Sequence, residues 1–161
     1  MIKIKSIAKL ALVTIAMMEA ISVRAGDSIE KAAMIAGVDR VIIERIIKAE
    51  SGGHPYVINT NSNLGSFKFS NIESAGRALD ILISKGYRSI DVGAAQINLR
   101  WHPELYKNPK DLLNPTLNII AAGKVLKKNS GGSTVVREMI GKYHSPNNSE
   151  RANRYASMVL K

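Results

Sequence analysis

The chain has 161 residues, a formal net charge of +10 at pH 7 and no cysteine. Without cysteine, disulfide bonds, thiolate metal sites and cysteine nucleophiles are excluded, so stability must come from packing. The excess of lysine and arginine favours an anionic neighbour, and we expect cell-wall material or anionic lipid before nucleic acid.

The first 25 residues are typical of a secretory signal peptide, with a basic start followed by the apolar run from Leu10 to Met18. That run is too short to span a bilayer, and Val23-Arg24-Ala25 resembles a cleavage site. We therefore expect a signal peptide over residues 1–25 and a periplasmic or secreted protein that keeps no integral membrane segment. An uncleaved N-terminal anchor is the alternative.

Helical periodicity runs through most of residues 26–161, and no repeat or linker divides them. This predicts one compact, mainly α-helical domain with about six to seven helices. A helix is expected over 27–36, and Asp39 can cap a second helix that ends at Gly52. The second helix has one isoleucine-rich face and one charged face.

Between Pro55 and Ser70 the helical pattern gives way to period-two alternation, which predicts a small β-hairpin or an ordered loop. Ser70 and Glu73 can form a capping box, so a helix is expected from there through Lys85. A further short helical piece is expected over 93–99.

In the last third of the chain, the sequence predicts several helices that follow one another. Asn114 as a cap and a proline after it open a helix to about Asn129. Ser133 can cap the next helix, and a terminal helix is expected from about Ser149.

Glu50 is the candidate catalytic residue. It continues the apolar stripe of Ile42 and Ile46 and lies in the last helical turn, where unpaired carbonyls carry partial negative charge. Desolvation and this charge both disfavour the carboxylate, so we expect an acid that keeps its proton and can donate it to a glycosidic oxygen. A solvated glutamate before a Gly-Gly turn is the alternative, which this stretch by itself favours.

A series of motifs carries a resemblance to a known family. In chain order they are Glu50-Ser51, Gly93-Ala94-Ala95-Gln96-Ile97-Asn98, Asn118 with Gly123, Tyr143 and Tyr155. The series resembles the lytic transglycosylases of the lysozyme-like superfamily over about residues 33–160. The segments GYRSIDVGAAQINLRWHPELY and YHSPNN are similar to those of small members that accompany conjugation, type IV secretion, pilus and related envelope machines.

The resemblance implies an α+β lysozyme-like fold, a transglycosylase domain over residues 26–161, and a possible hairpin beside the cleft. It makes Glu50 the single catalytic acid/base and Ser51 a helper that hydrogen-bonds near the reaction centre. Tyr143 matches the tyrosine of the family's Ala-Tyr-Asn motif, close to the acid and the substrate. His144, beside it, is expected to line the cleft.

The resemblance also assigns the groove for the glycan strand. The matching segment is the family's Gly-Leu-Met-Gln, and the residues expected to bind substrate there are Gly93, Ala95, Gln96 and Asn98. This chain departs from the family by having Ala94-Ala95 in place of Leu-Met, which would widen the cleft. It departs again over residues 142–146, where Lys-Tyr-His-Ser-Pro replaces Ala-Tyr-Asn-Ala-Gly.

The reaction that the resemblance implies needs one carboxyl group. Glu50 protonates the oxygen between N-acetylmuramic acid and N-acetylglucosamine, and then accepts the proton of the muramyl 6-hydroxyl as that oxygen closes onto C1. The product is a 1,6-anhydromuramyl end, and no water is consumed. Ordinary glycosidases use two carboxylates. Asp91 is the best second candidate, although capping the helical piece after it is the favoured role.

No cofactor or metal ion is expected, because His54, His102 and His144 share no ligand spacing. For Trp101, packing is favoured over stacking on a sugar ring.

The expected partners are peptidoglycan glycan strands and components of an envelope machine. Alternatives are a lysozyme that hydrolyses with water, a non-catalytic wall-binding adaptor, and a helix-turn-helix DNA-binding protein built on KAAMIAGVDRVIIERIIK. We expect no nucleic acid partner, because the second helix of that unit is rich in isoleucine and offers few side chains that read base edges.

Overall fold

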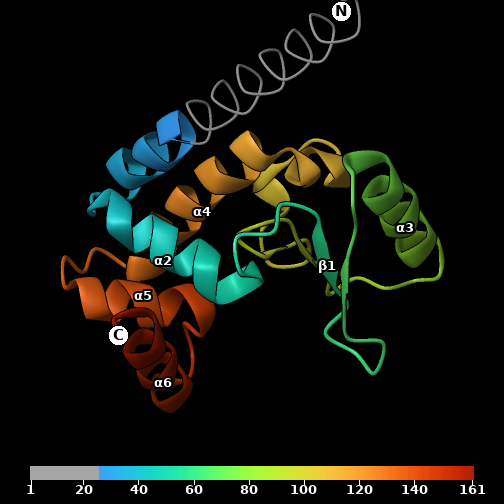
Figure 1. Cartoon of the computed structure of the whole chain (residues 1–161). Coiled ribbons are helices and arrows are strands. Elements are labelled where there is room, and N and C mark those ends of the chain that lie inside the picture. Colours follow the sequence, from blue (N-terminus) through green and yellow to red (C-terminus); the bar gives the residue numbers. More distant parts are fainter. Residues whose placement is uncertain (1–25) are drawn as a thin grey trace, which may run out of the picture.

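The structure is a computed structural model that describes residues 26–161, and the signal peptide expected over residues 1–25 lies outside them (Figure 1). A first helix covers 26–36. The other α-helices are α2 (Arg40–Ser51), α3 (Ile72–Ser84), α4 (Pro115–Ser130), α5 (Val136–His144) and α6 (Ser149–Val159). Two 3₁₀ helices, η1 (Pro103–Leu105) and η2 (Pro109–Leu113), precede α4. The strands are β1 (Val57–Asn59), β2 (Ser66–Lys68), β3 (Asp91–Val92) and β4 (Ile97–Asn98).

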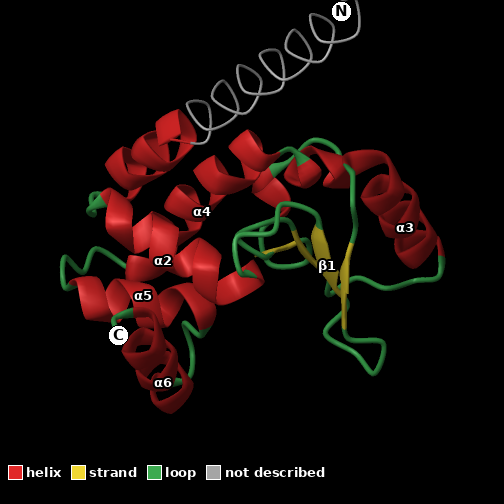
Figure 2. Cartoon of the chain, in the orientation of Figure 1, coloured by secondary structure: helices red, strands yellow, loops and turns green. Residues whose placement is uncertain are grey.

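The prediction of a mainly α-helical domain with a small antiparallel sheet is confirmed. The helix over 26–36, α2, α4, α5 and α6 form one side of the molecule, and the sheet with α3 forms the other (Figures 1 and 2). Within residues 26–161, no helix is long and apolar enough to cross a membrane.

Local capping explains where α2 begins and ends. The Asp39 side chain accepts a hydrogen bond from the backbone N–H of Val41, and Gly52 ends the helix in the left-handed conformation. The isoleucine face is buried through Ile43, Ile46 and Ile47. The expected second helix is therefore confirmed at both ends.

Two expected caps are wrong by one or two residues. The N-cap of α3 is Asn71, whose side chain accepts from the backbone N–H of Ser74, and not Ser70. The N-cap of α5 is Val135, which makes no side-chain cap, and not Ser133. The Ser133 hydroxyl donates to the carboxylate of Glu138 and accepts from the backbone N–H of Val135. At α3 two neighbouring polar residues can both serve as caps, and the chain uses the second.

The helices approach closely where α4 crosses the first helix. A Cβ atom on Gly123 would lie 2.3 Å from the carbonyl oxygen of Ala32, so any larger residue would push the two backbones apart. Gly123 therefore permits the close approach of α4 and the first helix.

The four strands form an antiparallel sheet in the order β2-β1-β3-β4. Of the hairpin and the ordered loop that the sequence left open between Pro55 and Ser70, the structure has the hairpin, formed by β1 and β2, where Ile58 lies opposite Phe67. The central strand β1 also pairs with β3, and Asn59 lies opposite Asp91. The sheet thus brings the loop after β1 next to β3.

The short helical piece expected over 93–99 is wrong, because this segment is a second hairpin made of β3, a tight turn and β4. Gly93 and Gln96 have φ angles of 83° and 51°, left-handed values that turn the chain back on itself. Buried residues alternate with polar ones along both strands: Ile90, Val92, Ile97 and Leu99 are buried. Asp91 therefore belongs to a strand, and the capping role favoured for it is wrong.

Asn118 of α4 fixes this second hairpin to the helices. Its fully buried amide accepts from the backbone N–H of Ala95 and donates to the carbonyls of Val92 and Leu112, at 2.8 to 3.0 Å. A Cβ atom on Gly93 would lie 2.3 Å from that amide. The turn between β3 and β4 is therefore held against α4 by the Asn118 side chain.

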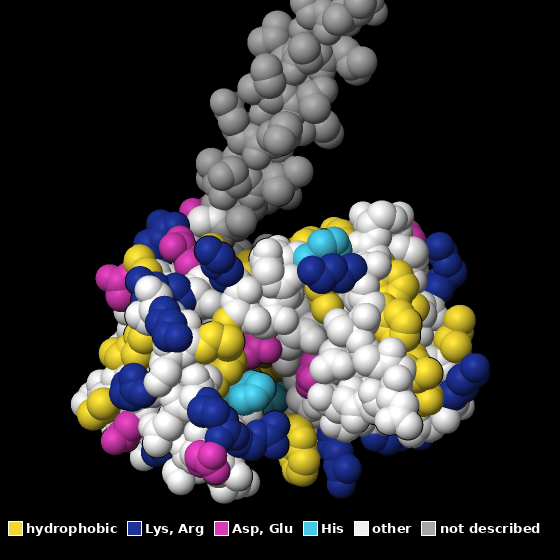
Figure 3. Space-filling model, turned by 60° about the horizontal axis from the view of Figure 1, so that its bottom comes forward, with side chains coloured by type: hydrophobic (Ala, Val, Ile, Leu, Met, Phe, Trp, Pro, Cys, Tyr) yellow, Lys and Arg dark blue, Asp and Glu magenta, His cyan; other side chains and the backbone are white. Residues whose placement is uncertain are grey.

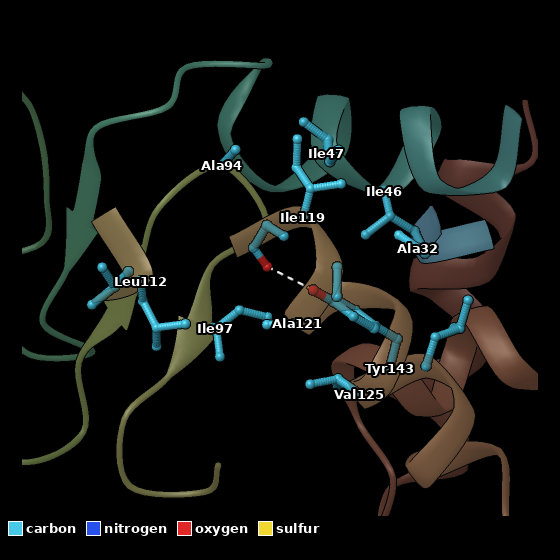
Figure 4. Packing of buried hydrophobic residues seen from close by; sticks show 14 of the residues in the cluster. Ala32, Ile46, Ile47, Ala94, Ile97, Leu112, Ile119, Ala121, Val125 and Tyr143 are labelled. Atoms are coloured by element: carbon cyan, nitrogen blue, oxygen red, sulfur yellow. Dashed lines mark hydrogen bonds between the residues drawn. The ribbon is translucent and has the colours of Figure 1, made fainter. Parts of the chain in front are cut away.

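Figure 4 shows how the core joins the two sides of the molecule. Ile46 and Ile47 of α2 face Ile119 of α4, and Tyr143 of α5 points between the helices toward the turn that precedes β4. The residues around the turn therefore sit on a packed core shared with the helices.

Candidate functional site

A cavity of about 900 Å³ lies where the helical side of the molecule meets the sheet. Figure 3 shows the hollow, with acidic side chains on its two sides and histidine beside it. The predicted site residues among its lining are Glu50, Gln96, Asn98, Tyr143 and His144, and Asp91 also lines it. The structure thus gathers residues from α2, the second hairpin and α5 at one place.

Glu50 lies in the last turn of α2, and its side chain is 14% exposed. The hydroxyl of Tyr155, in α6, donates a hydrogen bond of 2.6 Å to its Oε1 atom. Burial, and next the charge of Glu50, raise the pKa of Tyr155, which keeps the phenol protonated and able to donate. The protonated state that we expected of Glu50 itself stays a prediction.

The side chain of His144 forms part of the cavity wall beside Glu50. Its ring stacks on that of Tyr155 with 4.5 Å between the ring centroids, and its Nδ1 atom lies 3.8 Å from Oε1 of Glu50. Since the His144 side chain is 40% exposed, it is accessible to a ligand in the cavity.

Tyr143 points into the same region from α5 and is almost fully buried. Its hydroxyl donates a hydrogen bond of 2.7 Å to the carbonyl oxygen of Ala95. Burial, and next the charge of Glu50, hold the pKa of Tyr143 well above its usual range. Tyr143 therefore links α5 to the turn before β4 as a neutral phenol.

The turn between β3 and β4 presents Gln96 to the cavity. The Gln96 amide donates to the carbonyls of Gly93 and Val57, at 2.8 and 3.3 Å, which holds the side chain against the sheet. Gly93 and Ala95 are buried and are not among the lining residues, so they shape the turn through their backbone.

Ser51, like Gly93 and Ala95, is a predicted site residue that does not line the cavity. Its hydroxyl donates to the carbonyl oxygen of Ile47 within α2, and its side chain is buried and does not line the cavity.

Asp91, for which the sequence favoured a capping role over that of a second carboxylate, lines the cavity together with three asparagine side chains. The carboxylate of Asp91 accepts hydrogen bonds from the amides of Asn59, Asn61 and Asn98. Burial raises the pKa of Asp91, and the bonds from Asn98 and Asn61 oppose that rise. The sequence held a signal for this cluster, since a run of polar residues begins at Asn59, the last residue of β1.

Trp101 is 63% exposed and lines the cavity, so the packing role favoured for it is wrong. The guanidinium of Arg100 lies 5.1 Å from the centroid of the indole. An exposed indole beside a polar cavity is suited to stacking on a sugar ring.

No group of three histidine, aspartate or glutamate side chains in residues 26–161 could hold a metal ion. His54 uses Nδ1 to accept from the backbone N–H of Tyr56. His102 is buried, and burial lowers its pKa.

Comparison with protein families finds that residues 27–158 match the model of the Transglycosylase SLT domain. Searches among curated proteins and among solved structures find no match to this chain.

Proposed function

The chain belongs to the family of the transglycosylase SLT domain and is thus a peptidoglycan lytic transglycosylase of the lysozyme-like superfamily, and on this premise we propose how its residues cleave the glycan. The observation that carries the proposal is the position of Glu50, which lies at the cavity with one carboxyl oxygen bonded to Tyr155.

We propose that Glu50 acts first as an acid. It donates a proton to the oxygen between N-acetylmuramic acid and N-acetylglucosamine, and the bond from the muramyl C1 to that oxygen breaks. Tyr155 occupies Oε1, so we assign the proton to the other carboxyl oxygen, Oε2. The helix and the phenol together orient the carboxyl group toward the cavity.

Glu50 then acts as a base. It accepts the proton of the muramyl 6-hydroxyl while that oxygen bonds to C1, which regenerates the acid and leaves a 1,6-anhydromuramyl end. The same carboxyl group serves both steps, so the substrate supplies its own nucleophile and no water enters the reaction.

The glycan strand would bind along the polar wall formed by Gln96, Asn98, Tyr143 and His144. Amide and imidazole groups suit the hydroxyl and acetamido groups of the two sugars, because they can both donate and accept hydrogen bonds. Gly93 and Ala95 would act by shaping the turn. The place of Ser51 adds no support for a sugar contact, and its helper role stays a prediction.

Mass spectrometry of digested peptidoglycan tests this mechanism. Anhydromuramyl ends are the expected product. Reducing ends would instead favour the alternative of a lysozyme-type hydrolase, since hydrolysis adds water at C1. Intact strands would contradict both and favour an adaptor that binds the wall without cleaving it.

We further propose that residues 1–25 export the enzyme to the periplasm or the outside, and that it opens the wall locally for a secretion, conjugation or pilus machine. The support is the basic and apolar N-terminal sequence and the resemblance of the segments over 86–106 and 143–148 to those of machine-associated members. Fractionation with N-terminal sequencing tests export. A gene deletion complemented by wild type but not by Glu50→Gln, with transfer or secretion as the readout, tests the role.

A further inference from the structure

Asp91 faces the same cavity as Glu50, from the sheet instead of from the helices. The alternation along β3 explains its orientation: Ile90 and Val92 on either side are fully buried, so Asp91 points to the opposite face, toward the cavity. Both carboxyl groups line this cavity, and the pKa of Asp91 is raised first by burial and to a smaller extent by the charge of Glu50.

Three asparagine amides hold this carboxylate. Asn98 donates to Oδ1 at 2.6 Å, and Asn61 and Asn59 donate to Oδ2 at 2.7 and 3.2 Å. They come from β4, from the loop after β1 and from the end of β1. Both oxygens of Asp91 are therefore fixed by donors from several segments.

The orientation of each key amide is determined by the backbone. The Oδ1 atom of Asn98 accepts from the backbone N–H groups of Arg100 and Trp101, so its NH₂ group must face Asp91. Likewise Oδ1 of Asn59 accepts from the backbone N–H of Asn61, which leaves the NH₂ group for Asp91. The amides of Asn59, Asn61 and Asn98 form a cradle that presents only hydrogen-bond donors to Asp91. Such an environment suits an ionised carboxylate.

Part of the cradle is strained. Asn61 has a φ angle of 50°, in the left-handed region that non-glycine residues seldom adopt. Its amide reaches Asp91 from this conformation. Such strain persists where the surrounding structure holds it in place, and it is common at ligand sites.

No lysine or arginine in residues 26–161 forms a salt bridge with Asp91. The cradle orients the Asp91 carboxylate, and no cation neutralises it. Its negative charge is therefore directed at whatever occupies the cavity. In glycoside cleavage the sugar ring acquires positive charge at C1 and at its ring oxygen as the bond to the leaving group breaks.

We propose that Asp91 is a second catalytic carboxylate, which lies against the muramyl ring and stabilises the positive charge that develops there while Glu50 protonates the leaving oxygen. This inference rests on the proposed function, because that charge arises only if the glycosidic bond is cleaved. Asp91 remains ionised throughout and exchanges no proton. The bonds broken and formed are those already described at C1.

The competing role for Asp91 is structural, because the cradle also ties the loop after β1 to β3 and β4. The two roles predict different kinetics. Removing charge stabilisation in the transition state lowers kcat and leaves KM nearly unchanged, whereas loosening the loop changes KM and thermal stability.

The experiment compares Asp91→Asn, Asn61→Gly and wild type on purified peptidoglycan strands. Asp91→Asn should lower kcat by about 100-fold, a typical cost of removing one preorganised electrostatic group, with KM within about threefold. Asn61→Gly keeps the carboxylate, suits the left-handed backbone and removes one donor, so its kcat should fall by far less. Equal kcat in Asp91→Asn and wild type overturns the inference, as does a loss of kcat in Asn61→Gly as large as in Asp91→Asn.

Chemical rescue of kcat is a second measurement, and it should show no effect if the role of Asp91 is only structural. In Asp91→Ala, added formate should enter the vacated space and restore part of kcat, while formate should leave Glu50→Gln inactive. No rescue in a folded Asp91→Ala protein contradicts the inference. If both Asp91 variants fail to fold, Asp91 is structural and the inference is wrong.

The outcomes separate this inference from the proposed function. Wild type that yields anhydromuramyl ends, with an inactive Glu50→Gln, supports the proposed function whatever Asp91 does. An Asp91→Asn protein of full activity in that setting overturns the second carboxylate alone. Wild type that yields no anhydromuramyl ends overturns both.

Discussion

The hydroxyl of Tyr155 donates a hydrogen bond of 2.6 Å to Oε1 of Glu50, across 105 positions of sequence. The last helix of the chain therefore orients the side chain at the end of α2. His144 stacks on the same phenol, so Glu50, Tyr155 and His144 form one unit at the cavity.

Replacing Glu50 by Gln should abolish cleavage, because the amide has a similar shape but cannot donate an acidic proton. Release of anhydromuramyl products measured by mass spectrometry should fall below detection. Thermal unfolding and pull-down with peptidoglycan should remain close to wild type, which controls for folding and binding. A fully active variant would refute the assignment of Glu50.

Replacing Tyr155 by Phe removes the hydroxyl that orients the acid. We expect kcat to fall by about tenfold, because a donor held at 2.6 Å is lost while the ring that stacks on His144 remains. Tyr106→Phe is a matched control, since it loses a hydroxyl bond of 2.9 Å to the carbonyl of Leu99 and does not line the cavity. Equal rates in the two variants would remove Tyr155 from the site.

Replacing Tyr143 by Phe should cost less activity than Glu50→Gln but remain measurable, because the turn that carries Gln96 loses its link to α5. The carbonyl of Ala95 would be left without that donor, so the free energy of unfolding should fall by about 1–3 kcal/mol. Urea denaturation measures the stability, and initial rates on peptidoglycan measure the activity. An unchanged rate would argue against a role for Tyr143 in the site.

Replacing Gly123 by Ala should lower the free energy of unfolding by about 1–3 kcal/mol, because the new Cβ would overlap the backbone of Ala32. Gly76→Ala is the matched control in α3. There the nearest atom, at 3.3 Å, belongs to the flexible side chain of Lys110, and alanine favours helix. Urea denaturation should therefore show a much larger loss for Gly123→Ala, and similar losses would contradict the close approach of the two helices.

Because His102 is buried, we expect the free energy of unfolding to depend on pH. Burial lowers its pKa below the ordinary value of 6.5, so the folded state disfavours the charged imidazole. The stability that this neutral histidine contributes is present above pH 6.5 and is lost as the pH falls through the lowered pKa of the folded state. Urea denaturation at pH 8 and pH 5 should show a larger loss for wild type than for His102→Gln. Equal losses would contradict the prediction.

The sequence by itself determined most of the helices and the place of Glu50 at a helix end, and it left a hairpin or an ordered loop open between Pro55 and Ser70. Those features depend on local physics, namely side-chain caps, glycine ends and the spacing of apolar residues, which neighbours along the chain are enough to set. The same local reasoning placed the cap of α3 one residue too early. It also predicted a helix over 93–99, where the pairing of β4 with β3 outweighs the local helical preference.

The tertiary structure alone decided which side chains share the cavity. Tyr155 reaches Glu50, and Asn61 reaches Asp91, through contacts between segments far apart in the chain. Trp101 is exposed beside the cavity instead of packed in the core. Such contacts depend on how helices and strands pack in space, so the periodicity of a single segment does not predict them.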